Sequence, residues 1–328
     1  GMKTEEVRRV FEEIKPQQVE LLQEIVDKGP VVDDSVLYLH YDEQKQWDFG
    51  VDVIRKFGFD FKSGRQDRSV HPFTTEFGHG DVRITTHFDT EFLSMALFGT
   101  MHEAGHAMYE QGVSKSVSRT MLHNGASLAV HESQSRMWEN LVGRSLPFWK
   151  AFYPRLQELF PGNLGNVSLV DFYRAANKVE PSLIRIFADE MTYNLHIMLR
   201  FDLELALMQG DLEASALPDA WNSKMEEYLG ITPPNDAKGV LQDVHWSGGM
   251  IGYFTTYALG NLIASMMWEK IMEDIPDLDA RIEKAEFGGL LAWLREKVHR
   301  HGAKFKPMDL VQRVTGQSLT AEPYMRYL

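Results

Sequence analysis

Apolar residues recur every three or four positions along most of the chain, as they do in helices that bury one face. This spacing predicts helices at residues 4–28, 46–57, 90–111, 126–143, 146–160, 168–178, 182–209, 218–229, 248–274, 278–300 and 307–314. Pro16 predicts a break in the first helix, because proline lacks the N–H that an interior turn donates. Asp89 and Thr90 are candidate N-caps of helix 90–111, and Gly112 is its candidate stop.

Strand-like alternation is clear only in DVRITTHF, residues 81–88, where Val82, Ile84 and Thr86 alternate with Arg83 and Thr85. The chain shows no repeat, no low-complexity segment and no linker-like change of composition. We therefore expect a mainly α fold, built as a single large multi-helix domain over residues 1–328. It should hold at most a small β element near residues 81–88.

A stretch without charged side chains, residues 247–268, is long enough to span a membrane. Its glycines, together with Asn261 and Ser265, make it only moderately apolar. We expect a helix that is buried inside the protein.

Acidic residues outnumber basic ones by 47 to 34, which gives a formal net charge of −13. This balance argues against nucleic acid or an anionic membrane as the main partner, because both bind basic surfaces. The chain has no cysteine, so disulfides, thiolate zinc sites and cysteine nucleophiles are excluded. Residues 1–14 lack the apolar core of a signal peptide. We expect a cytoplasmic protein in which nitrogen and oxygen atoms hold any metal.

The stretch TMHEAGHAMYEQG, residues 100–112, places His102 and His106 four positions apart on a predicted helix. Residues at this spacing share one helix face, so both imidazoles can reach a single ion. Glu103 projects about 100° around the axis, close to a water on that ion. The pattern is typical of zinc hydrolases.

A third ligand is expected, because hydrolytic zinc sites use three protein ligands and leave a position for water. The predicted helix 126–143 supplies His131 and Glu132 in a largely apolar setting. Burying an unpaired carboxylate is costly, and a metal partner for Glu132 removes that cost. His131 is the rival ligand, although adjacent helical residues diverge by about 100°. The alternative is that the histidines are ordinary core or surface residues and Glu132 is solvated.

Seven motifs lie in order along the chain, namely HPF (71–73), DVRIT (81–85), HEAGH (102–106), HESQ (131–134), IRIFAD (184–189), GVLQDVHW (239–246) and GYFTTYALG (252–260). From about residue 5 to its end, the chain resembles the carboxypeptidase Taq family of zinc metallocarboxypeptidases. The resemblance implies a nearly all-α fold with a deep cleft, a homodimer, and zinc- or cobalt-dependent removal of single residues from peptide C-termini. It also implies that His102, His106 and Glu132 bind the metal and that Glu103 is the catalytic carboxylate.

Relatives in this family have a substantial helical segment before the part that residue 5 matches, and a short tail after EPYMRYL. The sequence does not include that helical segment. We expect the metal site to be intact without it, and we expect the enclosure of the substrate to be affected. Three alternatives stay open beside a carboxypeptidase. They are a zinc endopeptidase or oligopeptidase with the same centre, a truncated non-catalytic relative that acts as a binding protein, and a helical scaffold whose motif arose by chance.

Peptide hydrolysis needs a nucleophile, oxyanion stabilisation and a proton for the leaving amine. A bound metal lowers the pKa of its water, and Glu103 would take that proton and return it to the leaving nitrogen. His245 and Tyr253, with Tyr257 as a substitute, are candidate donors to the oxyanion. The tyrosines could equally be core residues.

A carboxypeptidase also binds the terminal carboxylate of its substrate, for which arginine is the best-suited side chain. Arg83 and Arg185 are the candidates. Arg185 could instead form an ion pair with Asp189 four positions later. Glu190 and His196, with Asp189, could accept hydrogen bonds from the metal-binding rings or form a buried structural network.

Overall fold

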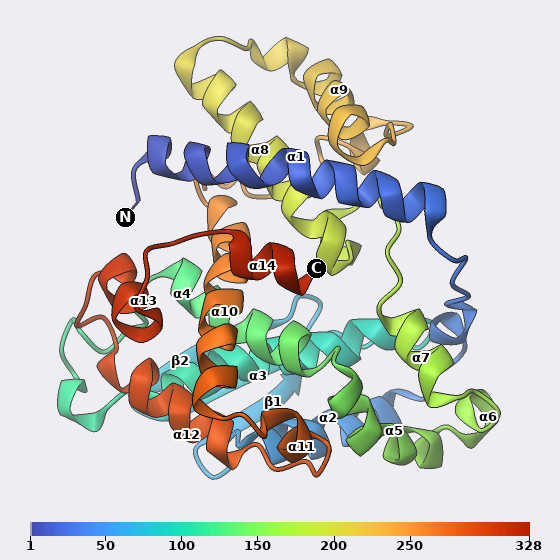
Figure 1. Cartoon of the computed structure of the whole chain (residues 1–328), viewed down its shortest axis with the longest axis vertical. Coiled ribbons are helices and arrows are strands. Elements are labelled where there is room, and N and C mark those ends of the chain that lie inside the picture. The colour runs from blue at the N-terminus through green and yellow to red at the C-terminus, as the bar shows by residue number, and fades with distance from the viewer. Residues whose placement is uncertain (1) are drawn as a thin grey trace. The chain divides into compact units, whose positions relative to one another are not determined.

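Helices account for most of the chain in a computed structural model that describes residues 2–328 (Figure 1), so the predicted mainly α fold is confirmed. The helices are α1 (Thr4–Lys28), α2 (Glu43–Phe57), α3 (Leu93–Gly112), α4 (Leu128–Arg136), α5 (Leu146–Leu159), α6 (Pro161–Leu164), α7 (Leu169–Ala176), α8 (Glu190–Gln209), α9 (Leu217–Leu229), α10 (Thr255–Asp274), α11 (Leu278–Ile282), α12 (Gly288–Lys297), α13 (Pro307–Thr315) and α14 (Glu322–Tyr327). The strands are β1 (Gly64–Arg68), β2 (Phe73–Gly78) and β3 (Asp81–Thr86).

Contacts between residues divide the chain into two compact units. The first unit contains the residues up to Val31, Lys178–Leu259 and Thr320–Leu328, and the second contains Val32–Asn177 and Gly260–Leu319. Helix α10 begins in the first unit and continues in the second. A single domain over residues 1–328 stays a prediction.

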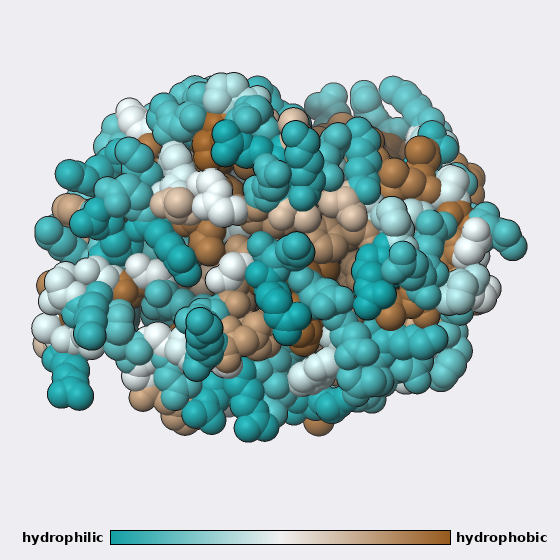
Figure 2. Space-filling model, turned by 90° about the horizontal axis from the view of Figure 1, so that it is seen from below, coloured by the Kyte–Doolittle hydropathy of each residue, from teal (hydrophilic) through white to brown (hydrophobic). Residues whose placement is uncertain are grey.

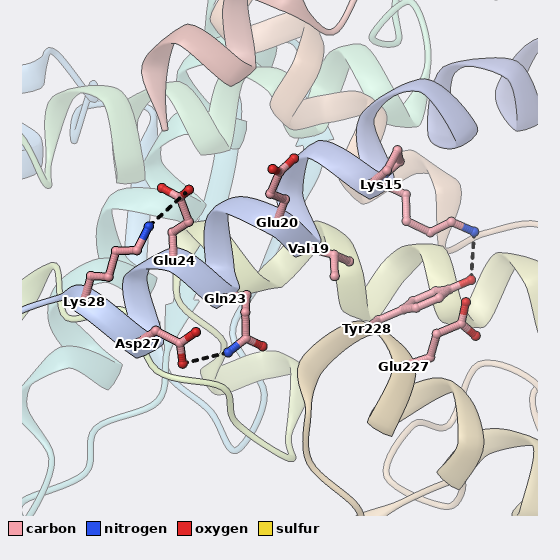
Figure 3. Close-up of a pocket in the computed structure, with 10 residues that line it drawn as sticks. Lys15, Val19, Glu20, Gln23, Glu24, Asp27, Lys28, Glu227 and Tyr228 are labelled. Atoms are coloured by element: carbon pink, nitrogen blue, oxygen red, sulfur yellow. Dashed lines mark hydrogen bonds and ion pairs between the residues drawn. The ribbon is translucent and has the colours of Figure 1, made fainter.

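In the first unit, α1 packs against α8 and α9. The predicted break at Pro16 is wrong, because the helix continues through it. Apolar side chains on both sides of the proline, such as Ile14 and Leu22, are buried. Their packing offsets the one backbone hydrogen bond that proline cannot make. Beside this face, α1 and α9 border an open hollow of about 540 Å³, where Lys15 Nζ lies 2.8 Å from the Tyr228 hydroxyl (Figure 3).

In the second unit, a three-stranded sheet has the order β1-β3-β2, with β1 parallel and β2 antiparallel to β3. The predicted strand is β3, whose Val82 and Ile84 are fully buried, and α3 packs against it. The sequence did not predict β1 or β2. Strand β1 reads GRQDR and has Gln66 as its buried residue, so it carries no apolar alternation.

Several helix starts differ from the prediction. The N-cap of α3 is Phe92, whereas Asp89 accepts a hydrogen bond from the backbone N–H of Glu91. Helix α8 begins only at Glu190, because Asp189 caps it by accepting the first free backbone N–H groups. Residues 278–300, expected as one helix, form α11 and α12.

Along residues 2–328, none of the helices combines the length and the apolar character that a membrane span needs. Part of the uncharged stretch 247–268 lies in α10, where Ala258, Ile263 and Met267 are buried. This part agrees with the expected buried helix, whereas residues 247–254 lie outside α10, and Met250 and Ile251 there are exposed. The face seen in Figure 2 is mostly hydrophilic, with apolar residues exposed between the polar ones.

Candidate metal centre

Two neighbouring helices of the second unit, α3 and α4, bring the three predicted ligands together. His102 and His106 lie on one face of α3, and Glu132 lies on α4. Their ligand atoms all lie within 4.8 Å of one another. The Oε2 atom of Glu132 is 3.6 Å from His102 Nε2 and 3.4 Å from His106 Nε2.

This donor set fits a divalent metal ion. Bonds of about 2.0–2.1 Å in a tetrahedral site place neighbouring donor atoms roughly 3.3 Å apart. The separations of 3.4 and 3.6 Å are close to that spacing. Two imidazoles and one carboxylate are also the ligands of one class of hydrolytic zinc site. His131 is not part of this group. Its Nδ1 lies 2.6 Å from Nδ1 of His106, which is the ring nitrogen of His106 that points away from Glu132.

Two glycines allow the helices around the centre to approach closely. A Cβ atom on Gly105 would lie 2.7 Å from the carbonyl oxygen of Gln134 on α4. A Cβ atom on Gly260 would lie 2.5 Å from Cγ of Glu132. Glycine is therefore required at both positions for this packing.

The two carboxylate oxygens of Glu132 have different partners. Oε1 accepts a hydrogen bond from Arg136 Nε at 2.7 Å, while Oε2 faces both imidazoles. Burial opposes the charge of Glu132, but Arg136 and His102 outweigh it and hold its pKa well below the ordinary value. The carboxylate therefore stays ionised and offers one oxygen to an ion.

The outer ring nitrogen of His102, Nδ1, lies 2.7 Å from Glu139 Oε2. Glu139 belongs to η3 (Met137–Val142), a π-helical continuation of α4, and also accepts from Arg136 at 3.3 Å. Burial opposes its charge, but Arg136 and His102 lower the pKa of Glu139 to about 2. The same balance holds for His102: burial opposes its protonation, but Glu132 and Glu139 outweigh burial and raise the pKa of His102 to about 9. The carboxylate thus directs Nε2 of His102 inward.

The outer nitrogen of His106 meets an imidazole in place of a carboxylate. His106 Nδ1 contacts His131 Nδ1, and His131 Nε2 lies 2.5 Å from Glu110 Oε1. Burial lowers the pKa of His106 to about 3, although Glu132 opposes this shift. His106 is therefore neutral at physiological pH, which is the form of histidine that binds a metal, whereas an ion would have to displace the proton of His102. Of the two alternatives left open for Asp189, Glu190 and His196, the contacts of these rings do not match the first, because the outer ring nitrogens face Glu139 and His131.

Glu103 follows His102 on α3, is only 6% exposed, and interacts electrostatically with His102 and Glu132. Its Oε2 accepts a hydrogen bond from the Thr74 hydroxyl of β2 at 2.7 Å. Burial raises the pKa of Glu103, while His102 and Thr74 act in the opposite direction. A carboxylate with a raised pKa can take up and release a proton near neutral pH more readily than an ordinary one.

The family model of carboxypeptidase Taq (M32) metallopeptidases matches residues 1–328. The chain belongs to the carboxypeptidase Taq family. The resemblance seen in the sequence motifs is thereby confirmed.

Named relatives agree with this membership. The chain is 47% identical to thermostable carboxypeptidase 1 of Thermus thermophilus, over all of the chain and 64% of that relative. It is 42% identical to carboxypeptidase 1 of Bacillus subtilis, over 66% of that protein. The structure of an M32 carboxypeptidase from Deinococcus radiodurans R1 aligns with a TM-score of 0.97 at 44% identity, covering all of the chain and 66% of that structure. The chain therefore spans about two thirds of the length of these relatives.

The first unit of this carboxypeptidase Taq family member contains a second polar cluster. Arg185, in η4 (Arg185–Phe187), and Arg200, on α8, both bind Asp243, at 2.7 and 2.6 Å. The amide oxygen of Gln242 accepts from the backbone N–H of Arg185 and from the Arg200 guanidinium, both at 2.9 Å. The IRIFAD and GVLQDVHW motifs are thus joined. The alternative of an ion pair between Arg185 and Asp189 is not observed, because Asp189 caps α8 and Arg185 pairs with Asp243.

His245, Tyr253 and Tyr257 lie together in the same unit. His245 Nε2 is 3.1 Å from the Tyr257 hydroxyl, and its ring centroid is 5.4 Å from that of Tyr253. Burial lowers the pKa of His245, and Arg185 lowers it further. A neutral His245 next to a phenol can provide one directed hydrogen-bond donor.

The other candidate arginine of this family member, Arg83, is placed differently. It lies on β3 in the second unit, bonds to Asp81 at 3.2 Å and stacks against the Phe77 ring at 4.6 Å. Its side chain is 44% exposed. The guanidinium therefore faces solvent, whereas that of Arg185 is buried.

Sequence reasoning missed four residues of the metal centre: Thr74, Glu110, Glu139 and Arg136. Three of them carried a signal. Arg136 and Glu139 follow Glu132 by four and seven positions, and Glu110 follows His106 by four, so each shares a helix face with a predicted ligand. Thr74 carried none, because a hydroxyl on an unpredicted strand has no distinctive spacing.

Proposed function

We propose that this chain is a metal-dependent carboxypeptidase that removes single residues from the C-termini of peptides. The convergence of His102, His106 and Glu132, with Glu103 at their side, carries this proposal. The family match over the whole chain supports it. Zinc is the proposed metal, and cobalt is a possible replacement, because imidazole and carboxylate ligands suit both.

When bound, such an ion would polarise the scissile carbonyl and lower the pKa of a water molecule. Glu103 would accept the proton of the attacking water and pass it to the leaving nitrogen. Thr74 would hold the Glu103 carboxylate in place through its hydroxyl. His245 and Tyr253, with Tyr257 in the same cluster, are the proposed donors to the developing oxyanion.

Arg83 and Arg185 are the proposed binding residues for the terminal carboxylate of the substrate. Arg185 is pre-positioned, because Asp243 and the Tyr193 hydroxyl hold its guanidinium in one orientation. Arg83 is accessible, although Asp81 already partly neutralises it. Both arginines therefore stay candidates for binding the terminal carboxylate of the substrate.

The proposal also includes a homodimer, a cytoplasmic location and peptide as the only macromolecular partner class. The net charge of −13 supports the exclusion of nucleic acid and anionic membranes. The family resemblance is the basis for the homodimer.

We expect zinc- or cobalt-loaded protein to shorten a peptide with a free C-terminus by one residue at a time. The C-terminal amide of the same peptide should stay intact, because it lacks the carboxylate that the enzyme binds. Mass spectrometry of both peptides, with and without a chelator, measures this. Internal cleavage of the amide would indicate an endopeptidase, and no cleavage by fully metal-loaded protein would indicate a non-catalytic relative.

Replacing the arginine that binds the substrate carboxylate should raise KM about 10- to 100-fold, since a hydrogen bond to a charged group contributes about 1.5–3 kcal/mol. Arg83→Gln and Arg185→Gln are the variants, and steady-state kinetics on the free-acid peptide gives the KM of each. Metal content is the control and should not change. An unchanged KM excludes that arginine from the role.

A further inference from the structure

We propose that Glu110 and His131 are positioning residues that fix the hydrogen of His106 on Nδ1 and so direct its Nε2 toward the metal. We call this chain of contacts the Glu110–His131–His106 relay. The inference rests on the proposed metal site and concerns residues outside its ligand set.

The relay consists of two short contacts between ring nitrogens and one carboxylate. His106 Nδ1 and His131 Nδ1 are 2.6 Å apart, and His131 Nε2 and Glu110 Oε1 are 2.5 Å apart. Two imidazole nitrogens at this distance share one hydrogen, so one ring donates and the other accepts. Geometry alone permits either direction.

Glu110 decides the direction. An ionised carboxylate can only accept hydrogen bonds, so Nε2 of His131 must carry a hydrogen. With the hydrogen of the ring on Nε2, Nδ1 is the nitrogen of His131 that offers an electron pair, and His106 Nδ1 donates to it. The remaining nitrogen of His106, Nε2, is left with a free electron pair. It is this atom that lies 3.4 Å from Glu132 Oε2.

The surroundings hold the His131 ring in this position. A Cβ atom on Gly125 would lie 2.9 Å from Cδ2 of His131, so the glycine makes room for the ring. The Tyr109 ring centroid is 5.0 Å from that of His131, and the Tyr109 hydroxyl accepts the backbone N–H of Ala126 at 3.0 Å. The side chains of His131 and Glu110 are 20% and 13% exposed, so solvent competes little for their hydrogen bonds.

The two ring ligands are therefore supported in different ways. His102 donates directly to Glu139, which two arginines surround at 3.3 and 4.0 Å. His106 reaches the carboxylate of Glu110 only through the His131 ring. Acceptors behind metal-binding histidines typically change metal affinity by 10- to 100-fold when removed.

The first test compares zinc affinity, measured by competition with a chelator at constant pH. His131→Phe removes the acceptor and should weaken zinc binding about 10- to 100-fold. His131→Gln keeps an acceptor oxygen in place of Nδ1 and should restore most of that loss. Equal affinities of the wild type and His131→Phe would overturn the proposal, as would a failure of glutamine to bind zinc more tightly than phenylalanine does.

A matched control is available in the same unit. His123 Nε2 lies 2.7 Å from Glu76 Oε1, and the two side chains are 13% and 17% exposed. His123→Phe therefore removes a similar histidine–glutamate pair that does not include a proposed ligand. Its zinc affinity should equal that of the wild type, and an equal loss in both variants would mean that His131 acts only through general stability.

The second test observes the hydrogens directly, by NMR of zinc-loaded protein with 15N-labelled histidine. We expect His106 to carry its hydrogen on Nδ1 and His131 to carry its hydrogen on Nε2. In Glu110→Gln, a second tautomer of His131 should become populated, because an amide can donate as well as accept. A wild-type His131 with its hydrogen on Nδ1 would overturn the relay.

Neither test uses turnover, so the two proposals fail separately. Wild-type protein that binds zinc but hydrolyses no peptide would refute the proposed function alone. The relay alone would be refuted if the protein were active, His131→Phe bound zinc as tightly as the wild type, and the histidine tautomers of Glu110→Gln equalled those of the wild type.

Discussion

Glu103→Gln is expected to abolish peptide hydrolysis while the metal content stays at the wild-type level. The amide has the same shape as the carboxylate but cannot take up the proton of the attacking water. General bases contribute about 10²- to 10⁴-fold to the rate, so kcat should fall by at least that range. Metal retention is expected because the converging ligand atoms belong to His102, His106 and Glu132. Elemental analysis and peptide kinetics on the same preparation measure both quantities.

The control for this substitution is Glu91→Gln. Glu91 is an exposed glutamate of the second unit that pairs with His40 at 2.7 Å. Its variant should keep full activity. Substantial turnover by fully metal-loaded Glu103→Gln would remove Glu103 from the proposed role.

Asp243→Asn is expected to lower the free energy of unfolding by about 3–5 kcal/mol, the usual cost of removing one partner from a buried ion pair. Asp243 neutralises both Arg185 and Arg200, and the Arg200 side chain is fully buried. The amide leaves two arginines close together without a counter-charge. Urea denaturation at neutral pH measures the change.

The effect should depend on pH. Burial opposes the charge of Asp243, but Arg200 and Arg185 outweigh it and lower its pKa in the folded state. Its stabilising contribution is therefore complete above the unfolded pKa of about 3.9 and is lost as the pH falls through the lower folded value. The difference between wild type and variant should shrink below about pH 4. Glu322→Gln, which removes an exposed pair with Arg326, is the control and should change stability little at either pH. A difference that grows on acidification would contradict this account.

The convergence of the three candidate ligands could be predicted because its information is local. His102 and His106 are one helical turn apart, and that spacing alone places both imidazoles on one face. Glu132 required one further argument, the cost of burying a carboxylate in an apolar helix. The second carboxylate, Glu139, followed the same periodicity and could have been found by continuing along the face of Glu132.

Contacts between distant segments could not be predicted in the same way. Helical spacing offered Asp189 as an alternative partner of Arg185, but the carboxylate that pairs with Arg185 is Asp243, 58 positions away. Residues 182–189 are not part of α8, so a four-residue spacing does not place their side chains on one helix face. Similarly, β1 has a polar sequence and is recognisable as a strand only from its pairing with β3.

The close packing at Gly105 and Gly260 has a consequence for how an ion would be captured. Gly105 of α3 lies against the backbone of α4, and Gly260 of α10 lies against Glu132. Because there is so little space, α3, α4 and α10 cannot shift relative to one another here without a steric clash. The candidate ligands His102, His106 and Glu132 are thus preorganised, since the packed helices align them before any ion binds. An incoming ion then loses little of its binding free energy to ordering the polypeptide.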